Sequence, residues 1–232
     1  MIRGPRGYLN LYRNLRKNLN YQKVVSINVN ELIDNHFMYW SSADHINREG
    51  FRKALEGLME KPSVIIETGT SAWGADSTRL WDSYIRKFGG NLLTCDIRSE
   101  PRKQLSGQLS KNSKCIVGDS VAFLRKTRFK ADLYYLDSFD LDLVDPLPSA
   151  EHGFKEFMAI KDKFTSGTLL LVDDTPSNEF LTEFKQLPMG SVNFAQKYGV
   201  NAGKGAFIKQ YIERNFNFEL IHHDYSYLVR IL

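Results

Sequence analysis

The sequence predicts an α/β protein built on a doubly wound, mostly parallel sheet. Short apolar segments alternate along the chain with segments whose apolar residues recur at helical spacing, which is the order expected of a parallel sheet. Most of the apolar segments end in an acidic residue, where a strand would open into a loop. The chain closes with two strand-like segments in tandem, residues 218–222 and 225–231, which predict an antiparallel hairpin.

The composition favours one large domain, or a domain with an appended segment. Of the 232 residues, 42% are hydrophobic and 12% aromatic, enough for a substantial core. The chain has no run of about 18 apolar residues, so we expect no transmembrane segment and a cytoplasmic location. Cys95 and Cys115 fall in predicted strands and are interpreted as reduced core thiols. The net charge of +4 does not by itself indicate a nucleic-acid partner, and we expect none.

An N-terminal extension, residues 1–46, is predicted to precede a main domain of residues 47–232. Basic residues alternate with apolar residues at helical spacing between positions 8 and 19. The favoured interpretation is a helix that packs on the domain or on a second subunit of a homo-oligomer. The alternative is a basic arm that touches an anionic substrate, a lipid or a nucleic acid. Residues 36–45 are predicted to form a lid or a substrate wall.

Residues 63–76, SVIIETGTSAWGAD, form the unit around which the chain is organised. A short strand ends near Glu67 and opens into a loop of small residues that begins at Gly69, and a helix is predicted over residues 76–87. Strand, glycine-bearing turn and helix open many nucleotide-binding sheets, so we place the cofactor here. The G-x-G-x-x-G pattern that a diphosphate needs is absent, which argues against a nicotinamide cofactor.

The alternation continues regularly after this unit. The expected strands are residues 92–95, 114–117, 132–136 and 168–172, and the expected helices are residues 100–110, 120–126, 149–164 and 206–215, with Ser149 as a capping residue. Residues 175–205 are expected to be irregular. Within them, GVNAGKG at 199–205 is near a phosphate-binding loop in composition, but its spacing is one residue short and no Ser or Thr follows the lysine. We interpret it as a flexible loop on the substrate side.

Acidic residues at the strand ends are the main functional signal. Ligands of open α/β sheets bind beyond the carboxyl ends of the strands. Asp96 lies 27 residues after Gly69 and suits a ribose diol, because a carboxylate can accept from both hydroxyls. Asp119 and Ser120 could hold an adenine amino group or merely cap the next helix. The acids at these ends are Glu67, Asp96, Asp119, Asp137 and the pair Asp173-Asp174.

Two acidic clusters follow neighbouring predicted strands. Asp137 and Asp140 come after residues 132–136, and the pair Asp173-Asp174 comes after residues 168–172. Adjacent strands would bring these carboxylates together in an oxygen-rich site suited to Mg²⁺, Ca²⁺ or Mn²⁺. The alternative interpretation of Asp140 is a solvated loop residue.

The unit at Glu67-Thr68-Gly69 resembles the first motif of class I S-adenosylmethionine-dependent methyltransferases, and the resemblance covers about residues 47–232. It implies a Rossmann-like, seven-stranded sheet with the terminal antiparallel hairpin, and S-adenosylmethionine as cofactor. Asp96 resembles the family's ribose-binding acid, and Gly118-Asp119-Ser120 resembles its adenine-side motif. The loop departs from the family, with Ser71 where a glycine is usual and Gly74 later than usual. The resemblance assigns these residues to the cofactor: Glu67, Gly69, Thr70, Ser71, Asp96, Asp119, Ser120 and Asp137.

The acidic clusters resemble those of metal-dependent small-molecule O-methyltransferases, including sugar and catechol types. This resemblance implies that Asp137, Asp173 and Asp174 bind a divalent cation, Mg²⁺ in the first place, which would orient substrate oxygens and lower the pKa of the attacking hydroxyl. Asp140 lies near the position of the family's base. His152 is a second possible base, or a helix-surface residue.

We therefore expect an enzyme that transfers a methyl group from S-adenosylmethionine to a hydroxyl of a small molecule, a sugar or a phenol. Three alternatives remain at this point. One is a related hydroxylase-type enzyme of the same fold, and another is a cofactor-binding fold without catalysis. The third is a nucleic-acid-directed methyltransferase that uses the basic N-terminal arm.

Overall fold

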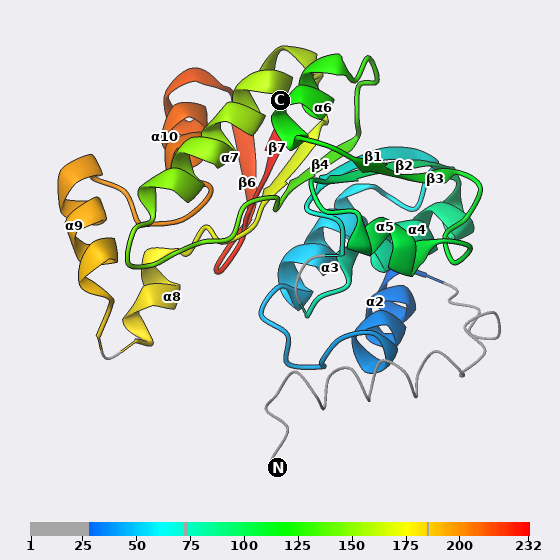
Figure 1. Ribbon diagram of the computed structural model, residues 1–232, viewed down its shortest axis with the longest axis horizontal. Helices are drawn as coiled ribbons and strands as arrows, with labels where there is room; N and C mark the ends of the chain where they lie inside the picture. Colours follow the sequence, from blue (N-terminus) through cyan, green and yellow to red (C-terminus); the bar gives the residue numbers. More distant parts are fainter. Residues whose placement is uncertain (1–27, 72–73, 185) are drawn as a thin grey trace.

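The computed structural model describes residues 28–71, 74–184 and 186–232 of the chain (Figure 1). The helix predicted between positions 8 and 19, with its basic arm, lies outside the described residues. No helix in the described part of the chain combines the length and the apolar character needed to cross a bilayer.

Within the described residues, seven strands form one sheet in the order β3-β2-β1-β4-β5-β7-β6. Strands β1 to β5 run parallel, and β7 pairs antiparallel with both β5 and β6. The strands are β1 Ser63–Thr68, β2 Gly90–Asp96, β3 Ser113–Val117, β4 Leu133–Leu136, β5 Leu169–Val172, β6 Phe218–His223 and β7 Tyr227–Ile231. The predicted fold, including the terminal hairpin, is confirmed. Cys95 and Cys115 are free thiols that lie in β2 and β3.

Helices cover both faces of the sheet (Figure 1). The α-helices are α2 Val29–Tyr39, α3 Arg48–Gly57, α4 Ser77–Phe88, α5 Glu100–Leu105, α6 Ser120–Lys126, α7 Leu147–Ile160, α8 Asn178–Thr182, α9 Met189–Tyr198 and α10 Ala206–Asn215. On one face α2, α3 and α4 form a core with side chains such as Ile65 and Tyr135. On the other face α6, α7 and α10 form a second core with Ile66 and Tyr134. Because successive strand residues face opposite cores, the central strands read as continuous apolar runs.

Three segments differ from the sequence-based expectation. Helix α5 ends at Leu105 rather than near residue 110, because Ser106 leaves the helical region and Gly107 has a φ of +71°. Helix α7 already begins at Leu147, so Ser149 is a buried residue inside the helix and not its cap. Residues 175–205, expected to be irregular, contain α8 and α9, and α9 packs against α7 and α10 (Figure 1).

The turn after β1 depends on a glycine. Gly69 has a φ of +82°, and a Cβ atom there would lie 2.0 Å from the backbone oxygen of Asp137. The chain therefore approaches the end of β4 more closely than any side chain permits. This contact fixes the loop after β1 against the first of the acidic residues that follow β4.

We expect Gly69→Ala to lower the free energy of unfolding by about 2–4 kcal/mol, because it adds both backbone strain and a clash with main-chain atoms. Urea unfolding followed by circular dichroism would measure the loss. Gly107→Ala is the matched control, since Gly107 also has a positive φ but nothing lies within 4 Å of its Cβ position. That variant should lose only about 1 kcal/mol. Equal losses in the two variants would contradict the role given to the close approach.

Candidate active site

The register of the central strands brings their carboxyl ends to one edge. Thr68 pairs with Leu136, and Leu136 pairs with Val172. The backbone N–H of Asp137 donates to the carbonyl oxygen of Thr68 at 3.1 Å, and that of Asp173 donates to Leu136 at 3.1 Å. The residues that follow β1, β4 and β5 are therefore held side by side by the sheet itself.

Three carboxylates converge at this edge. One oxygen from each of Asp137, Asp173 and Asp174 lies within 4.8 Å of the others. Asp174 adopts a φ of +44°, which turns the chain sharply directly after β5. The expected juxtaposition of the two acidic clusters is therefore present for these residues, whereas Asp140 is exposed in the loop beyond β4.

A lysine that the sequence analysis did not assign to the site completes this cluster. The ammonium of Lys204 forms ion pairs with Asp137 Oδ1 and, at 2.9 Å, with Asp174 Oδ2. Its side chain is only 6% exposed. Lys204 belongs to the segment 199–205, which we had interpreted as flexible, but its residues 202–205 are buried. The sequence signal was a lysine flanked by glycines, a pattern that permits close packing around one charged side chain.

Two tyrosines donate to the same carboxylates. The hydroxyl of Tyr135 lies 3.1 Å from Asp137 Oδ2 and 3.3 Å from Asp173 Oδ2. The hydroxyl of Tyr225 donates to Asp174 Oδ1. The remaining oxygen of the cluster, Asp173 Oδ1, is buried and has no hydrogen-bond partner among the described residues. This oxygen is therefore the one in the cluster for which the described residues supply no hydrogen-bond donor.

Burial dominates the electrostatics of the cluster. It raises the pKa of Asp173 well above its ordinary value, and the charges of Asp137 and Asp174 raise it further. Burial also raises the pKa of Asp137, although the Lys204 ammonium opposes this shift. For Lys204 burial alone would lower the pKa, but the surrounding carboxylates raise it above its ordinary value, so the side chain is held as a cation.

The donor set fits a divalent cation. Three carboxylates offer hard oxygen ligands, and Asp173 Oδ1 is a buried acceptor without a partner. The ammonium of Lys204, however, already pairs with two of the three carboxylates. A cation and this ammonium would therefore share the same oxygens.

Glu67 at the end of β1 anchors α4. It is fully buried and accepts hydrogen bonds from Ser77 Oγ at 2.6 Å, Thr78 Oγ1 at 2.5 Å and Trp81 Nε1 at 3.1 Å. Burial raises the pKa of Glu67 to about 7, and these hydrogen bonds limit the shift. The first turn of α4 thus fixes the end of β1, and both carboxylate oxygens of Glu67 face the protein interior.

The loop after Gly69 is tied to its surroundings by short polar contacts. The hydroxyls of Thr70 and Thr94 lie 2.7 Å apart in a buried position. The backbone N–H of Ser71 donates to Thr78 Oγ1 at 2.7 Å, and the Ser71 hydroxyl donates to Asp76 Oδ1 at 3.0 Å. The loop that begins at Gly69 is therefore anchored by these hydrogen bonds to the N-terminal end of α4.

The predicted ribose and adenine residues have partners of their own. Asp96 is buried, and Arg98 donates to it from the backbone N–H at 2.8 Å and from the guanidinium at 3.1 Å. The Arg98 side chain is 67% exposed, so it can leave without disturbing the core. Asp119 accepts from the backbone N–H of Ala122 at 2.7 Å and caps α6, as the alternative interpretation held.

His152 joins a polar cluster beside the acidic one. Its Nε2 lies 2.9 Å from Ser138 Oγ, 3.1 Å from Ser120 Oγ and 3.7 Å from Glu156 Oε1. Ser138 follows Asp137 directly, so α7 brings His152 to the loop after β4. The predicted adenine-side residue Ser120 and the second predicted base therefore lie within hydrogen-bonding reach of each other.

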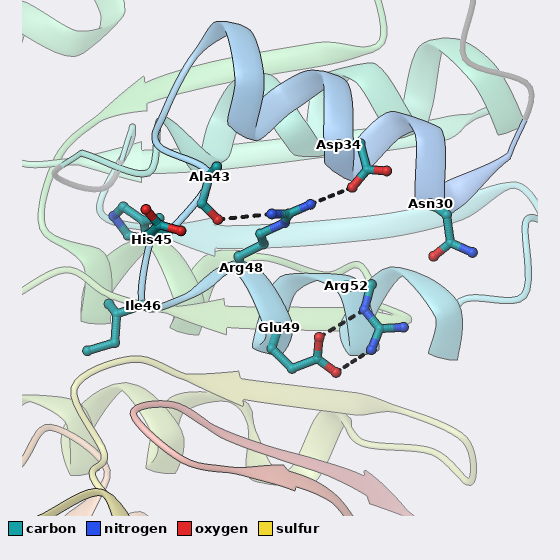
Figure 2. A pocket seen from close by; sticks show the side chains of 9 residues that line it. Asn30, Asp34, Ala43, His45, Ile46, Arg48, Glu49 and Arg52 are labelled. Atoms are coloured by element: carbon teal, nitrogen blue, oxygen red, sulfur yellow. Dashed lines mark hydrogen bonds and ion pairs between the residues drawn. The ribbon is translucent and has the colours of Figure 1, made fainter. Parts of the chain in front are cut away.

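A groove between α2 and α3 lies apart from these residues. Figure 2 shows that its charged side chains pair with one another: Arg48 donates to Asp34 and to the carbonyl oxygen of Ala43, and Arg52 pairs with Glu49. Among the described residues, none of those predicted for cofactor, metal or catalysis lines this groove. We therefore place the candidate site at the carboxyl edge of the sheet.

The solved structures that resemble this fold include several methyltransferases. MycE from the mycinamycin biosynthetic pathway, in complex with Mg, S-adenosylhomocysteine and mycinamycin VI, has a TM-score of 0.54 and 16% identity over 88% of this chain. The match covers 54% of MycE, so this chain spans about half its length. CalS11, a TDP-rhamnose 3'-O-methyltransferase of calicheamicin biosynthesis, has a TM-score of 0.50 and 14% identity, and the match covers 99% of this chain and 96% of CalS11.

A caffeoyl-CoA O-methyltransferase candidate from Staphylococcus aureus has a TM-score of 0.52 and 13% identity over 96% of this chain and 99% of its own. No protein-family model matches the sequence, and no curated protein matches it. The likeness in structure establishes that the chain has the fold of class I S-adenosylmethionine-dependent methyltransferases.

The raised pKa of Glu67 leads to a prediction about stability and pH. Between its ordinary pKa of 4.5 and the folded value of about 7, the folded state holds a proton that the unfolded state releases. Unfolding free energy should therefore fall as pH rises through this window, by about 2–4 kcal/mol relative to Glu67→Gln, which carries no titrating group.

Urea unfolding at pH 4 and pH 8 would measure this difference. Glu151→Gln, at an exposed position on α7, removes a surface carboxylate and is the control. If the difference in unfolding free energy between wild type and Glu67→Gln were the same at the two pH values, the raised pKa of Glu67 would be contradicted.

Proposed function

We propose that this chain is an enzyme that transfers the methyl group of S-adenosylmethionine to a hydroxyl of a small molecule, a sugar or a phenol. The observation that carries the proposal is the convergence of Asp137, Asp173 and Asp174 at the carboxyl edge of β4 and β5 in a methyltransferase fold. MycE holds Mg and S-adenosylhomocysteine, and CalS11 is named for O-methylation of a sugar nucleotide, which supports both the donor and the acceptor class.

The methyl donor is proposed to bind along the ends of β1, β2 and β3. The turn from Gly69 to Ser71 would face its methionine part, and Asp96 would accept from the ribose hydroxyls once the exposed Arg98 side chain moves aside. Asp119 and Ser120 would lie on the adenine side. Glu67 contributes by fixing the turn to α4 rather than by contact with the donor.

The reaction is an in-line displacement. The acceptor oxygen forms a bond to the methyl carbon while the bond from that carbon to the sulfonium sulfur breaks, and S-adenosylhomocysteine is released. The acceptor hydroxyl must lose its proton, and the proposed bases are Asp140 in the loop after β4 and His152 on α7. His152 is tied to Ser138 and Ser120, which orient its ring at the edge of the site.

We further propose that the site binds a divalent cation, Mg²⁺ in the first place. Asp137, Asp173 and Asp174 would hold it. When bound, it would supply orientation of the acceptor oxygens and a lower pKa for the attacking hydroxyl. The chain's own contribution is to keep these carboxylates together, through the sheet register and the hydroxyls of Tyr135 and Tyr225.

Binding of the methyl donor tests the central claim. We expect isothermal titration to detect S-adenosylmethionine binding to the wild type and at least about a tenfold weaker affinity in Asp96→Ala, which loses the charged acceptor of two hydroxyls. Asp162→Ala removes an acid whose side chain is 84% exposed and serves as the control. Absence of binding by the wild type at millimolar donor would refute the proposed function.

The assignment of the base can be tested with a panel of sugar and phenol acceptors, by measuring formation of S-adenosylhomocysteine. Loss of the base should lower turnover by about 10²–10⁴-fold while donor affinity stays unchanged. His152→Ala and Asp140→Ala are compared directly, because only one of the two should show this loss. Unchanged turnover in both variants would show that neither side chain takes the proton.

A further inference from the structure

We propose that Lys204 is a built-in counter-cation of the acidic cluster, so that a divalent cation can bind Asp137, Asp173 and Asp174 only by displacing the Lys204 ammonium. This inference rests on the cation part of the proposed function. Lys204 then sets the affinity of the site for the cation, and residues 203–205 belong to the site.

The backbone on either side of Lys204 is packed closely against the segment after β5. Its N–H donates to the carbonyl oxygen of Asp174 at 2.8 Å. A Cβ atom at Gly203 would lie 2.2 Å from that same oxygen, and one at Gly205 would lie 2.2 Å from Thr175 Oγ1. Only residues without a side chain fit on either side of Lys204, so the chain after β5 and the chain before α10 are packed directly together.

Helix α7 closes the third side. A Cβ atom at Gly153 would lie 2.4 Å from the carbonyl oxygen of Lys204. Three glycines, at positions 153, 203 and 205, therefore permit one buried lysine to approach the acidic residues. A surface lysine that happened to reach an acid would need none of these contacts, so the arrangement indicates a dedicated position for the ammonium.

The ammonium competes for the oxygens that a cation would need. It pairs with Asp137 Oδ1 and Asp174 Oδ2, which belong to two of the three proposed ligands. The other oxygens of these two residues accept from Tyr135 and Tyr225. A divalent cation placed among the carboxylates would lie next to a positive charge held in a buried site, and the two would repel each other strongly.

The Lys204 side chain can leave while the backbone stays in place. The close approaches at Gly203 and Gly205 position the backbone on either side of Lys204, whereas the ammonium is held by ion pairs at the end of a long side chain with several rotatable bonds. Metal entry would thus exchange one cation for another and leave the cluster with its charges compensated in both states.

The test compares Mn²⁺ binding to the full chain and to Lys204→Met, a neutral side chain of similar length, at one fixed pH. Electron paramagnetic resonance measures free Mn²⁺ directly, and thermal unfolding checks that each protein is folded. We expect weak binding by the wild type and at least a tenfold tighter affinity in Lys204→Met. Lys209→Met is the matched control, because it removes a positive charge from α10 that pairs with Glu213 away from the cluster; its affinity should equal that of the wild type.

A second measurement uses the wild type alone and does not depend on folding of a variant. Reductive methylation followed by mass spectrometry reports how accessible each lysine amine is. Saturating Mn²⁺ should increase the labelling of Lys204 at least severalfold, while labelling of Lys209 stays constant. Labelling of Lys204 that does not change at saturating Mn²⁺ would overturn the proposal.

Equal Mn²⁺ affinities in wild type and Lys204→Met would also overturn the proposal that Lys204 competes with the cation. The cation part of the proposed function would still stand. Absence of Mn²⁺ binding in both proteins would overturn the competition and the cation part together, because removal of the competitor would have uncovered no site. Donor binding by titration calorimetry decides separately whether the chain is a methyltransferase.

Discussion

The site depends on one constraint: three carboxylates carried by the ends of adjacent strands have to be compensated where water is largely excluded. The sheet register places Asp137 beside Asp173 and Asp174 regardless of what neutralises them. Compensation comes from Lys204, which precedes α10, and from Tyr225, which lies between β6 and β7. The C-terminal part of the chain therefore supplies groups that the carboxylates at the ends of the central strands need. The terminal hairpin extends the sheet and also carries Tyr225 to this edge.

Features that follow from local pattern could be predicted from the sequence. Strands buried on both faces appear as apolar runs, and parallel strands end at one edge, so the acids at positions 137, 173 and 174 could be expected to meet. Helix α10 has the predicted bounds because its apolar positions and its preceding glycine are both local signals. The end of α5 and the start of α7 could not be predicted as well, since the backbone leaves the helical region at Ser106 and α7 begins at Leu147, directly after Pro146.

Features that depend on packing between distant segments could not be predicted. Lys204 lies 30 residues beyond Asp174, across α8 and α9, and the glycines beside it were interpreted as signs of flexibility when they permit close contact. The partners of Glu67 could not be predicted either: Ser77 and Thr78 lie in the helix predicted over residues 76–87, but the sequence does not indicate that both donate to the buried acid. In each case the sequence contained the residue types but not the distance between them.

The two halves of the site compensate their acids in different ways, and this difference bears on function. Glu67 is satisfied by neutral donors within the scaffold, so the turn that is proposed to face the methyl donor is fixed before any ligand binds. Asp96 instead pairs with the exposed side chain of Arg98, and the acidic cluster pairs with Lys204 in addition to its two tyrosine donors. Ligand binding at these acids would thus be an exchange of partners rather than a rearrangement of the fold. In the proposed exchange, ribose hydroxyls would replace Arg98 at Asp96, and a divalent cation would replace the Lys204 ammonium at the acidic cluster.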